Sequence, residues 1–354
     1  MAPTSETAQG PARVVRTLRG LGWLGLLGLL AGTGLVWSAR WFWLGEVAVS
    51  FTWYLGLAGL AGGLFLALVG LRRTGLVALA LGLIHVGPEL WLWMPSQSVP
   101  SEDGRVLTLV TCNRRAGAPN VELVPEWLRT LEAELAVARG TPDERAIDVV
   151  AIQEANRAFL ESLDGLRDLY PHQAFAPPRA TWNDETFGTA ILSRWPFESA
   201  RELPVLPGVG RGPQDVVIDW GGAAVTVRNA HPMRPGKAWR VALRNGVLEQ
   251  LAELEWPEAS ILLGDLNMTS RSPMFGALVG ATGLRDSRMG FGRQPTYVVE
   301  QAAPLALGVP IDHVLVGTAW SVLDRTTRAI PASDHAAVIV ELAGAMGSRQ
   351  AGPE

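Results

Sequence analysis

The hydrophobic residues of this chain follow two different patterns. Between residues 20 and 94, long apolar stretches carry few charges, whereas from residue 105 onward short apolar runs alternate with amphipathic ones. Runs rich in Val, Ile and Leu predict strands at 105–112, 147–153, 188–193, 214–220, 223–230, 259–264, 311–317 and 335–341. Apolar residues at helical spacing predict helices at 121–139, 156–168 and 236–255. This alternation predicts one α/β domain over residues 105–341.

The apolar region at the N-terminus predicts a membrane anchor over residues 1–94. Three stretches, at about 20–37, 47–70 and 74–94, each approach the ~20 apolar residues that a bilayer core requires. A cleaved signal peptide accounts only for the first stretch and is the weaker interpretation. The bilayer is therefore the first expected partner, and the chain is expected in the cell membrane as a multi-pass protein.

Arginines beside the three stretches predict the orientation. Three precede the first, two separate the second from the third, and one lies between the first and second: Arg13, Arg16, Arg19, Arg72, Arg73 and Arg40. Because basic residues concentrate on the cytoplasmic side, the N-terminus is expected in the cytoplasm. Three crossings then place the α/β domain outside the cytoplasm. Residues 95–104 are predicted as a linker and residues 342–354 as a disordered tail.

Charge and cysteine content narrow the function classes. Residues 95–354 contain 24 Lys and Arg against 31 Asp and Glu, a formal charge of −7. This sign makes nucleic acid an unlikely partner, since such binders carry a basic surface. Cys112 is the only cysteine, which excludes an intramolecular disulfide and a thiolate zinc cluster. Nothing in the sequence identifies a protein partner.

The stretch "ILLGDLNMTS" at 261–270 places two polar residues at the end of an apolar strand. Asp265 and Asn267 are two positions apart, so their side chains are expected on the same face. The alternative is a strand followed by an Asx-type turn, because Gly, Asp and Asn together are common in turns.

Other predicted strands end or begin in the same way, with Asn113, Glu154, His231, Asp312, Asp334 and His335. Each has a local alternative as a turn residue, a helix charge or a strand cap. Together, however, they contain what a divalent-metal phosphoesterase needs. Carboxylate and amide oxygens suit Mg²⁺, or Mn²⁺ in its place.

Seven motifs in order resemble the endonuclease/exonuclease/phosphatase superfamily, the DNase I-like fold, over about residues 105–341. They are "TCN", "AIQEAN", "FGTAILSRWPF", "VRNAHP", "LLGDLNMTS", "PIDHVLV" and "SDHAAV". The resemblance implies a four-layer αββα sandwich and metal-dependent hydrolysis of phosphate esters or anhydrides, whether as a phosphatase or as a phosphodiesterase.

The same resemblance implies a role for each strand-end residue. Glu154 is expected to be the main metal ligand, with Asn113 and Asp334 in or beside the same shell. Asp265 is expected to orient or deprotonate the attacking water, and Asn267 to hold that water and a phosphate oxygen. His231 and His335 are expected to contact the phosphate, while Asp312 hydrogen-bonds His335 and favours its charged form. His313 points to the other face of its strand and is expected to pack.

The stretch after His231, "HPMRPGKAWR", adds Arg234, the sole lysine Lys237, and Arg240 as candidate ligands of a second phosphate. The alternative is a solvated basic start of a helix. The family's extra phosphate-contacting tyrosine or arginine is not assignable here, because Tyr170 and His172 are expected to pack.

The expected substrate follows from topology. A hydrolase tethered outside a membrane meets lipid phosphates at high local concentration. Helices followed by the hydrolase resemble the membrane-anchored branch that includes the teicoplanin-resistance protein VanJ. That resemblance implies a phosphorylated lipid, such as a polyprenyl pyrophosphate carrier. An extracytoplasmic membrane-anchored nuclease and a non-catalytic module are the alternatives; the charge of −7 disfavours the first, and the retained polar residues disfavour the second.

Overall fold

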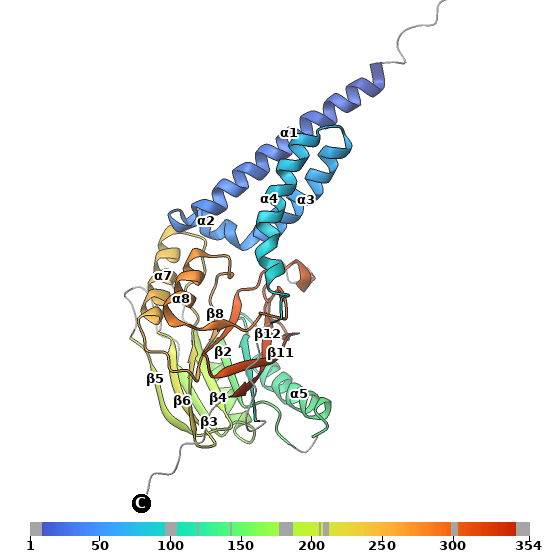
Figure 1. The fold of residues 1–354 in the computed structure, drawn as a ribbon. Helices are drawn as coiled ribbons and strands as arrows, with labels where there is room; N and C mark the ends of the chain where they lie inside the picture. Colours follow the sequence, from blue (N-terminus) through green and yellow to red (C-terminus); the bar gives the residue numbers. More distant parts are fainter. Residues whose placement is uncertain are drawn as a thin grey trace, which may run out of the picture. The chain divides into compact units, whose positions relative to one another are not determined.

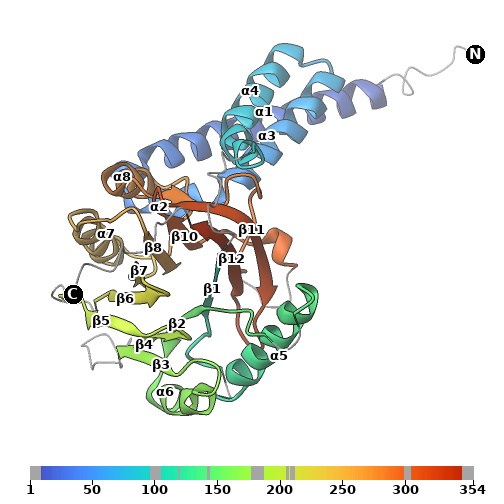
Figure 2. The ribbon, with the colours of Figure 1, turned by 60° about the horizontal axis from the view of Figure 1, so that its bottom comes forward.

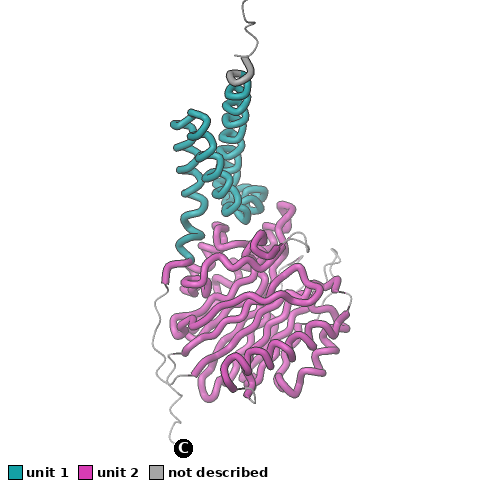
Figure 3. The backbone as a smooth tube through the Cα atoms, turned by 90° about the vertical axis from the view of Figure 1, so that its right-hand side faces the viewer, with its two compact units in different colours: residues 1–92 teal, residues 93–354 magenta. Residues whose placement is uncertain are grey.

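The computed structural model describes residues 9–95, 105–118, 120–141, 144–176, 187–204, 207, 212–298 and 304–344. The chain divides into two compact units, Met1–Leu92 and Trp93–Glu354 (Figure 3). The division falls two residues before the predicted end of the anchor. Of the predicted linker, residues 96–104 lie outside the described part of the chain.

The N-terminal unit is helical. It contains α1 (Gln9–Trp37), α2 (Trp43–Ala48), α3 (Thr52–Leu68) and α4 (Arg72–Trp91), with short 3₁₀ turns at Ser38–Arg40 and Val49–Phe51. Three helical stretches, 13–40, 43–68 and 72–91, are long and apolar enough to cross a membrane. The three predicted spans are thus confirmed as helices, although the third ends at Trp91 rather than at 94.

Helices α3 and α4 pack closely because glycines face each other between them. A Cβ atom on Gly59 would meet Gly82 Cα at 2.9 Å, and one on Gly82 would meet Leu60 N at 2.7 Å. Small residues that let helix backbones approach are typical of helix contacts within membranes.

The C-terminal unit contains two six-stranded mixed sheets (Figures 1 and 2). The first has the order β11 (Trp320–Ala329), β12 (Ala336–Gly344), β1 (Val106–Asn113), β2 (Val149–Ala155), β4 (Gly188–Ser193) and β3 (His172–Ala176). The second has the order β5 (Phe197–Glu202), β6 (Gln214–Trp220), β7 (Ala223–Asn229), β8 (Ser260–Asp265), β10 (Asp312–Val316) and β9 (Arg285–Asp286). Among the described strands, only β1–β2 and β7–β8 pair in parallel.

Three apolar clusters hold the layers together. Residues such as Leu107, Val227 and Leu263 fill the space between the sheets. Helices α5 (Leu123–Ala138) and α6 (Arg157–Ser162) cover the first sheet, while α7 (Ala238–Ala252) and α8 (Pro273–Thr282) cover the second (Figure 2). The predicted four-layer αββα sandwich is therefore confirmed.

Several predicted boundaries are wrong. Strands β3, β5, β9 and β11 and helix α8 were not predicted, and the predicted helix at 156–168 is α6 followed by a 3₁₀ turn at Leu163–Leu166. Strand β12 continues to Gly344, so residues 342–344 belong to the sheet and not to a tail. The rest of that tail, 345–354, lies outside the described residues.

Three residues that were expected to pack lie in packing environments. Tyr170 is buried and donates its hydroxyl to Glu132 Oε2 at 3.0 Å. His172 makes a ring contact with Phe197, with centroids 6.0 Å apart. His313 is buried against Phe275, with ring centroids 4.8 Å apart.

Candidate active site

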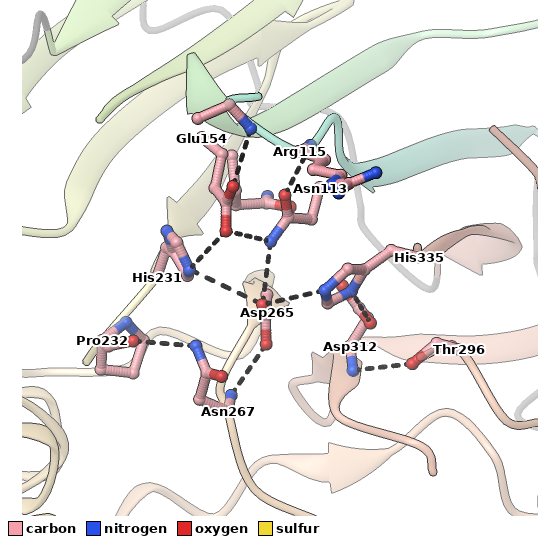
Figure 4. A network of polar contacts seen from close by, with 12 residues as sticks. Asn113, Arg115, Glu154, His231, Pro232, Asp265, Asn267, Thr296, Asp312 and His335 are labelled. Atoms are coloured by element: carbon pink, nitrogen blue, oxygen red, sulfur yellow. Dashed lines mark hydrogen bonds and ion pairs between the residues drawn. The ribbon is translucent and has the colours of Figure 1, made fainter. Parts of the chain in front are cut away.

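The predicted catalytic residues meet where the central strands end (Figure 4). Strands β1 and β2 are parallel, with Asn113 paired to Gln153, so Asn113 and Glu154 reach the same edge. Strands β8 and β10 are antiparallel, and Asp265 at the end of β8 pairs with Asp312 at the start of β10. Pairing thus brings together residues that are up to 222 positions apart in the chain, from Asn113 to His335.

Asp265 lies at the centre of the site. One carboxylate oxygen, Oδ2, accepts a hydrogen bond from Asn113 Nδ2 at 3.0 Å and faces His231 Nε2 at 3.6 Å and His335 Nε2 at 3.7 Å. The residue is 1% exposed. Burial and the nearby charge of Asp312 raise the pKa of Asp265 to about 7, although His335 and two hydrogen bonds oppose the rise. This carboxyl is thus suited to exchange a proton near neutral pH.

The stretch from Gly264 to Asn267 combines the two interpretations that the sequence left open. Asn267 N donates to Asp265 Oδ1 at 2.9 Å, which is an Asx-type turn, while Oδ2 still faces the site. Gly264 has φ +129°, and a Cβ atom there would meet Ala230 O at 2.1 Å. Only glycine therefore fits beside the chain that leads to His231.

Glu154 lies in a strained conformation at an irregularity near the end of its strand. Its φ is +57°, in the left-handed region, and the pairing of β2 with β4 shifts register between Ile152 and Ala155. Its carboxylate accepts from Asn113 Nδ2 at 3.2 Å and from Ala116 N at 2.8 Å. Burial opposes ionisation, but His231 and these donors together lower the pKa of Glu154. The carboxylate therefore remains charged at neutral pH.

Asp312 and His335 form the hydrogen-bonded pair that was predicted. His335 Nδ1 donates to Asp312 Oδ2 at 2.9 Å. Burial alone would lower the pKa of His335, but the charges of Asp312 and Asp265 outweigh it and raise the pKa to about 10. The ring is consequently an imidazolium at neutral pH, with Nε2–H directed at the centre of the site.

A short segment that the sequence analysis missed, Thr296–Val298, joins the starts of β10 and β12. Thr296 Oγ1 accepts the main-chain N–H groups of Ile311 and Asp312, each at 3.1 Å. Thr296 O accepts from Ala336 N at 2.6 Å, and Val298 N donates to Asp334 O at 3.1 Å. The segment therefore holds Asp312 and His335 at a defined separation.

Two further residues beside His335 were also missed. The ring of Tyr297 lies against His335, with centroids 4.8 Å apart. Ser333 Oγ donates to Asn113 O at 2.7 Å and accepts from His335 N at 3.0 Å. Tyr297 lies in "PTY" beside a short apolar run, which by itself is typical of a turn, and Ser333 is the first residue of the motif "SDHAAV".

Comparison with known proteins agrees with this geometry. The sequence profile of the endonuclease/exonuclease/phosphatase family matches residues 112–335. The chain belongs to this family. A search of curated proteins finds no match.

Solved structures share the fold. An endonuclease/exonuclease/phosphatase protein from Beutenbergia cavernae is 21% identical, with a TM-score of 0.51 over 69% of this chain and 72% of that one. TDP2 from Caenorhabditis elegans is 15% identical, with a TM-score of 0.50 over 82% and 89%. The 3′ phosphatase NExo from Neisseria, bound to a product DNA hairpin, is 19% identical, with a TM-score of 0.50 over 66% and 98%.

Enzymes of this family hydrolyse phosphate esters, and the chain is accordingly a phosphoester hydrolase. They typically depend on a divalent metal ion. The oxygens of Glu154 and Asp265, which converge on the Asn113 amide, form a donor set that fits a hard cation. A second grouping, Asp265, Asp312 and His335, has ligand atoms within 4.8 Å of one another. It fits less well, because its histidine is charged and bonded to Asp312.

Asn113 fits the metal in one orientation of its amide only. Nδ2 faces the two carboxylates, whereas Oδ1 accepts from Arg115 N at 3.0 Å. Turning the amide would present its oxygen to a cation and break the bond to Arg115. Asp334 is half-buried beside His335, and its charge helps to raise the pKa of that histidine. Its role as a ligand remains a prediction.

The three basic residues after His231 differ in position. Arg234 is exposed and close enough to Tyr297 to oppose the rise of its pKa, so it lies near the rim of the site. Lys237 is exposed at the start of α7, and Arg240 stacks over Trp239 at 5.2 Å. The role of all three as phosphate contacts remains a prediction.

The site contains the groups for attack by water on a phosphate. Asp265 can take a proton from water, and the Nε2–H of His335 can donate to a phosphate oxygen. His231, with Nε2 3.8 Å from Glu154 Oε1, faces the same space. A divalent cation held by Glu154 would neutralise charge on the phosphate. The amide Nδ2 of Asn267 instead donates to Pro232 O at 3.0 Å, so its predicted contact with water uses its oxygen.

Proposed function

We propose that this protein is a membrane-anchored, Mg²⁺-dependent hydrolase that acts outside the cytoplasm on a phosphorylated lipid, such as a polyprenyl pyrophosphate carrier. The observation that supports it most is the presence, in one chain, of three helices able to cross a membrane and a phosphoester hydrolase. Tethering keeps the enzyme at the surface where lipid phosphates are concentrated.

Two features of the charge distribution support the proposal. Five of the six arginines in the anchor region flank the predicted cytoplasmic side, which supports a hydrolase on the other side. The hydrolase part carries −7, whereas a nuclease benefits from a basic groove. Arg234 at the rim offers a contact for a second phosphate, as a pyrophosphate requires.

A direct assay separates the candidate substrates. The full chain, purified in detergent, is offered polyprenyl pyrophosphate, phosphatidylinositol, sphingomyelin and DNA, with Mg²⁺ or with EDTA. We expect phosphate release from the lipid pyrophosphate only with Mg²⁺, and none from a matched Glu154→Gln preparation. Cleavage of DNA alone would instead support the alternative, an extracytoplasmic nuclease. The Neisseria phosphatase bound to a DNA hairpin is the reason to retain this alternative.

The side of the membrane is tested by fusing a reporter after Glu354. Alkaline phosphatase should be active there and green fluorescent protein dark. Replacing Arg72 and Arg73 with acidic residues should make both reporters partly active, because these arginines are expected to hold the second loop in the cytoplasm. A fluorescent wild-type fusion would place the hydrolase in the cytosol and favour nucleotide or nucleic-acid substrates.

A further inference from the structure

A cavity of about 490 Å³ lies at the end of the sandwich where β1 and β2 begin. Its lining includes Arg105 and Val106 at the start of β1, and Asp148 just before β2. Asn113 and Glu154 lie at the other ends of these strands, and eight residues of strand extend over about 26 Å. The cavity is thus remote from the active site but shares its two central strands.

Positive charge is concentrated in this cavity. Among the described residues, four arginines line it, against two acidic residues: Arg105, Arg139, Arg145 and Arg194 against Glu144 and Asp148. Since Glu341 also pairs with Arg139, these groups leave one positive charge in excess, within a part of the chain whose net charge is −7. A local field of this sign attracts anions.

The arginines are held in place mainly by main-chain carbonyls, although Arg139 also pairs with Glu341 Oε1 at 2.6 Å and Arg194 lies 3.4 Å from Asp148 Oδ1. Each donates to a main-chain carbonyl: Arg105 to Trp220 O at 2.8 Å, Arg139 to Ala146 O at 2.6 Å, Arg145 to Leu169 O at 3.0 Å, and Arg194 to Arg145 O at 3.0 Å. A guanidinium has five N–H donors, so these bonds orient it and leave others for a ligand. Orientation before binding reduces the entropy that a ligand must overcome.

Two tryptophans in the lining pack against the arginines and not against a ring of the ligand. The guanidinium of Arg105 lies 4.2 Å from the ring centroid of Trp220, and that of Arg194 lies 5.4 Å from the centroid of Trp195. Trp195 Nε1 donates to Asp148 Oδ1 at 2.8 Å, which occupies that carboxylate. Recognition in the cavity consequently rests on charge and hydrogen bonding.

We propose that this cavity is a second, non-catalytic binding site for a terminal phosphate or pyrophosphate group. Guanidinium groups pair with phosphate oxygens through parallel N–H bonds, and the excess of arginine in the cavity favours an anion. The volume also accommodates the group that carries the phosphate. The source is either a free phosphate compound or the headgroup of an anionic lipid.

Calorimetry on the full chain in phosphatidylcholine nanodiscs, with EDTA present, tests the site with inorganic pyrophosphate. Arg145→Gln and Arg194→Gln should each weaken binding by about tenfold or more, the scale of one lost charged pair. Arg167→Gln is the matched control, because Arg167 is exposed and pairs with Asp164 away from the cavity. Absence of binding to the wild type, or weakening by Glu154→Gln instead, overturns the proposal.

A measurement on the wild type avoids the risk that a variant misfolds. Pyrophosphate should protect Arg145 and Arg194, but not Arg167, from phenylglyoxal, as detected by mass spectrometry. If an anionic lipid is the source, nanodiscs with phosphatidic acid should protect the same arginines without pyrophosphate. Protection by neither probe means that the cavity is not a phosphate site.

Discussion

Strand β10 separates two buried charged networks that behave in opposite ways. Asp312 and His313 are neighbours on this strand, so their side chains point to opposite faces of the sheet. Asp312 belongs to the catalytic cluster, in which burial and the nearby charge of Asp312 raise the pKa of Asp265 to about 7. His313 belongs to a network with Asp286, Arg288 and Arg325, which we call the arginine network.

In the arginine network, the one carboxylate is paired and the histidine is neutral, so its two arginines leave a net positive charge. Arg288 Nη2 donates to Asp286 Oδ2 at 2.6 Å and holds the pKa of Asp286 well below its usual range, although burial opposes this. Burial and Arg288 lower the pKa of His313 to about 4, so its ring stays neutral and bonds Met268 O at 2.8 Å. The catalytic cluster therefore keeps groups that can exchange or donate a proton, whereas we expect the pairing in the arginine network to stabilise the fold. Substitutions in the two should affect different measurements.

The largest expected effect is that of Glu154→Gln on activity. The variant keeps the size of the side chain but removes the charge that would bind the metal. We expect the rate to fall at least about 100-fold, the scale of losing one catalytic electrostatic group, with the thermal midpoint little changed. The measurement is the rate of phosphate release across a Mg²⁺ titration, and a near wild-type rate with unchanged Mg²⁺ dependence would disprove the metal site.

Next in size is the coupled loss at Asp312 and His335. Each residue is changed to alanine alone and then both together. Because Asp312 acts by orienting His335, the double variant should be little slower than His335→Ala alone. The comparison is of kcat/KM among the three variants, and simple additivity of the two losses would count against the pair.

Asp286→Asn should affect stability instead of activity. We expect a loss of about 2 kcal/mol at pH 7, because Arg288 loses its charged partner. A carboxyl whose pKa is lowered by folding contributes its full stabilisation at pH values above its unfolded pKa of about 3.9. This stabilisation is lost as the pH falls further. The midpoint of thermal unfolding should therefore differ widely between wild type and variant at pH 6, and this gap should narrow near about pH 3. A gap independent of pH would contradict the pairing.

The smallest effect is expected from Thr296→Val, which removes the acceptor of two main-chain N–H groups beside Asp312. Activity should fall by about tenfold, roughly one lost hydrogen bond to a positioned group. Thr296→Ser keeps the oxygen and should restore the rate. A valine variant as active as the serine variant would remove Thr296 from the positioning of Asp312.

The strands show which part of the fold the pattern could predict. All eight predicted strands are interior strands of the two sheets, and the missed β3, β5, β9 and β11 are the four edges. An interior strand is covered on both faces and reads as an apolar run, as in "ILLGD". Edge strands such as "FESARE" carry charge that blocks pairing with other chains and resemble loops.

The candidate site likewise has a part that the sequence predicted and a part that it could not predict. The sequence by itself determined which chemical groups are present, because Asp265, Glu154 and His335 interrupt apolar strands whose ends must meet at one edge of a sheet. Only the tertiary structure decided which atoms face each other. The amide of Asn113, Thr296 beneath Asp312, and the arginines around the remote cavity depend on contacts between segments far apart in the chain. Local periodicity reports on burial, whereas hydrogen bonds across such distances depend on how the layers pack, and no local pattern records that packing.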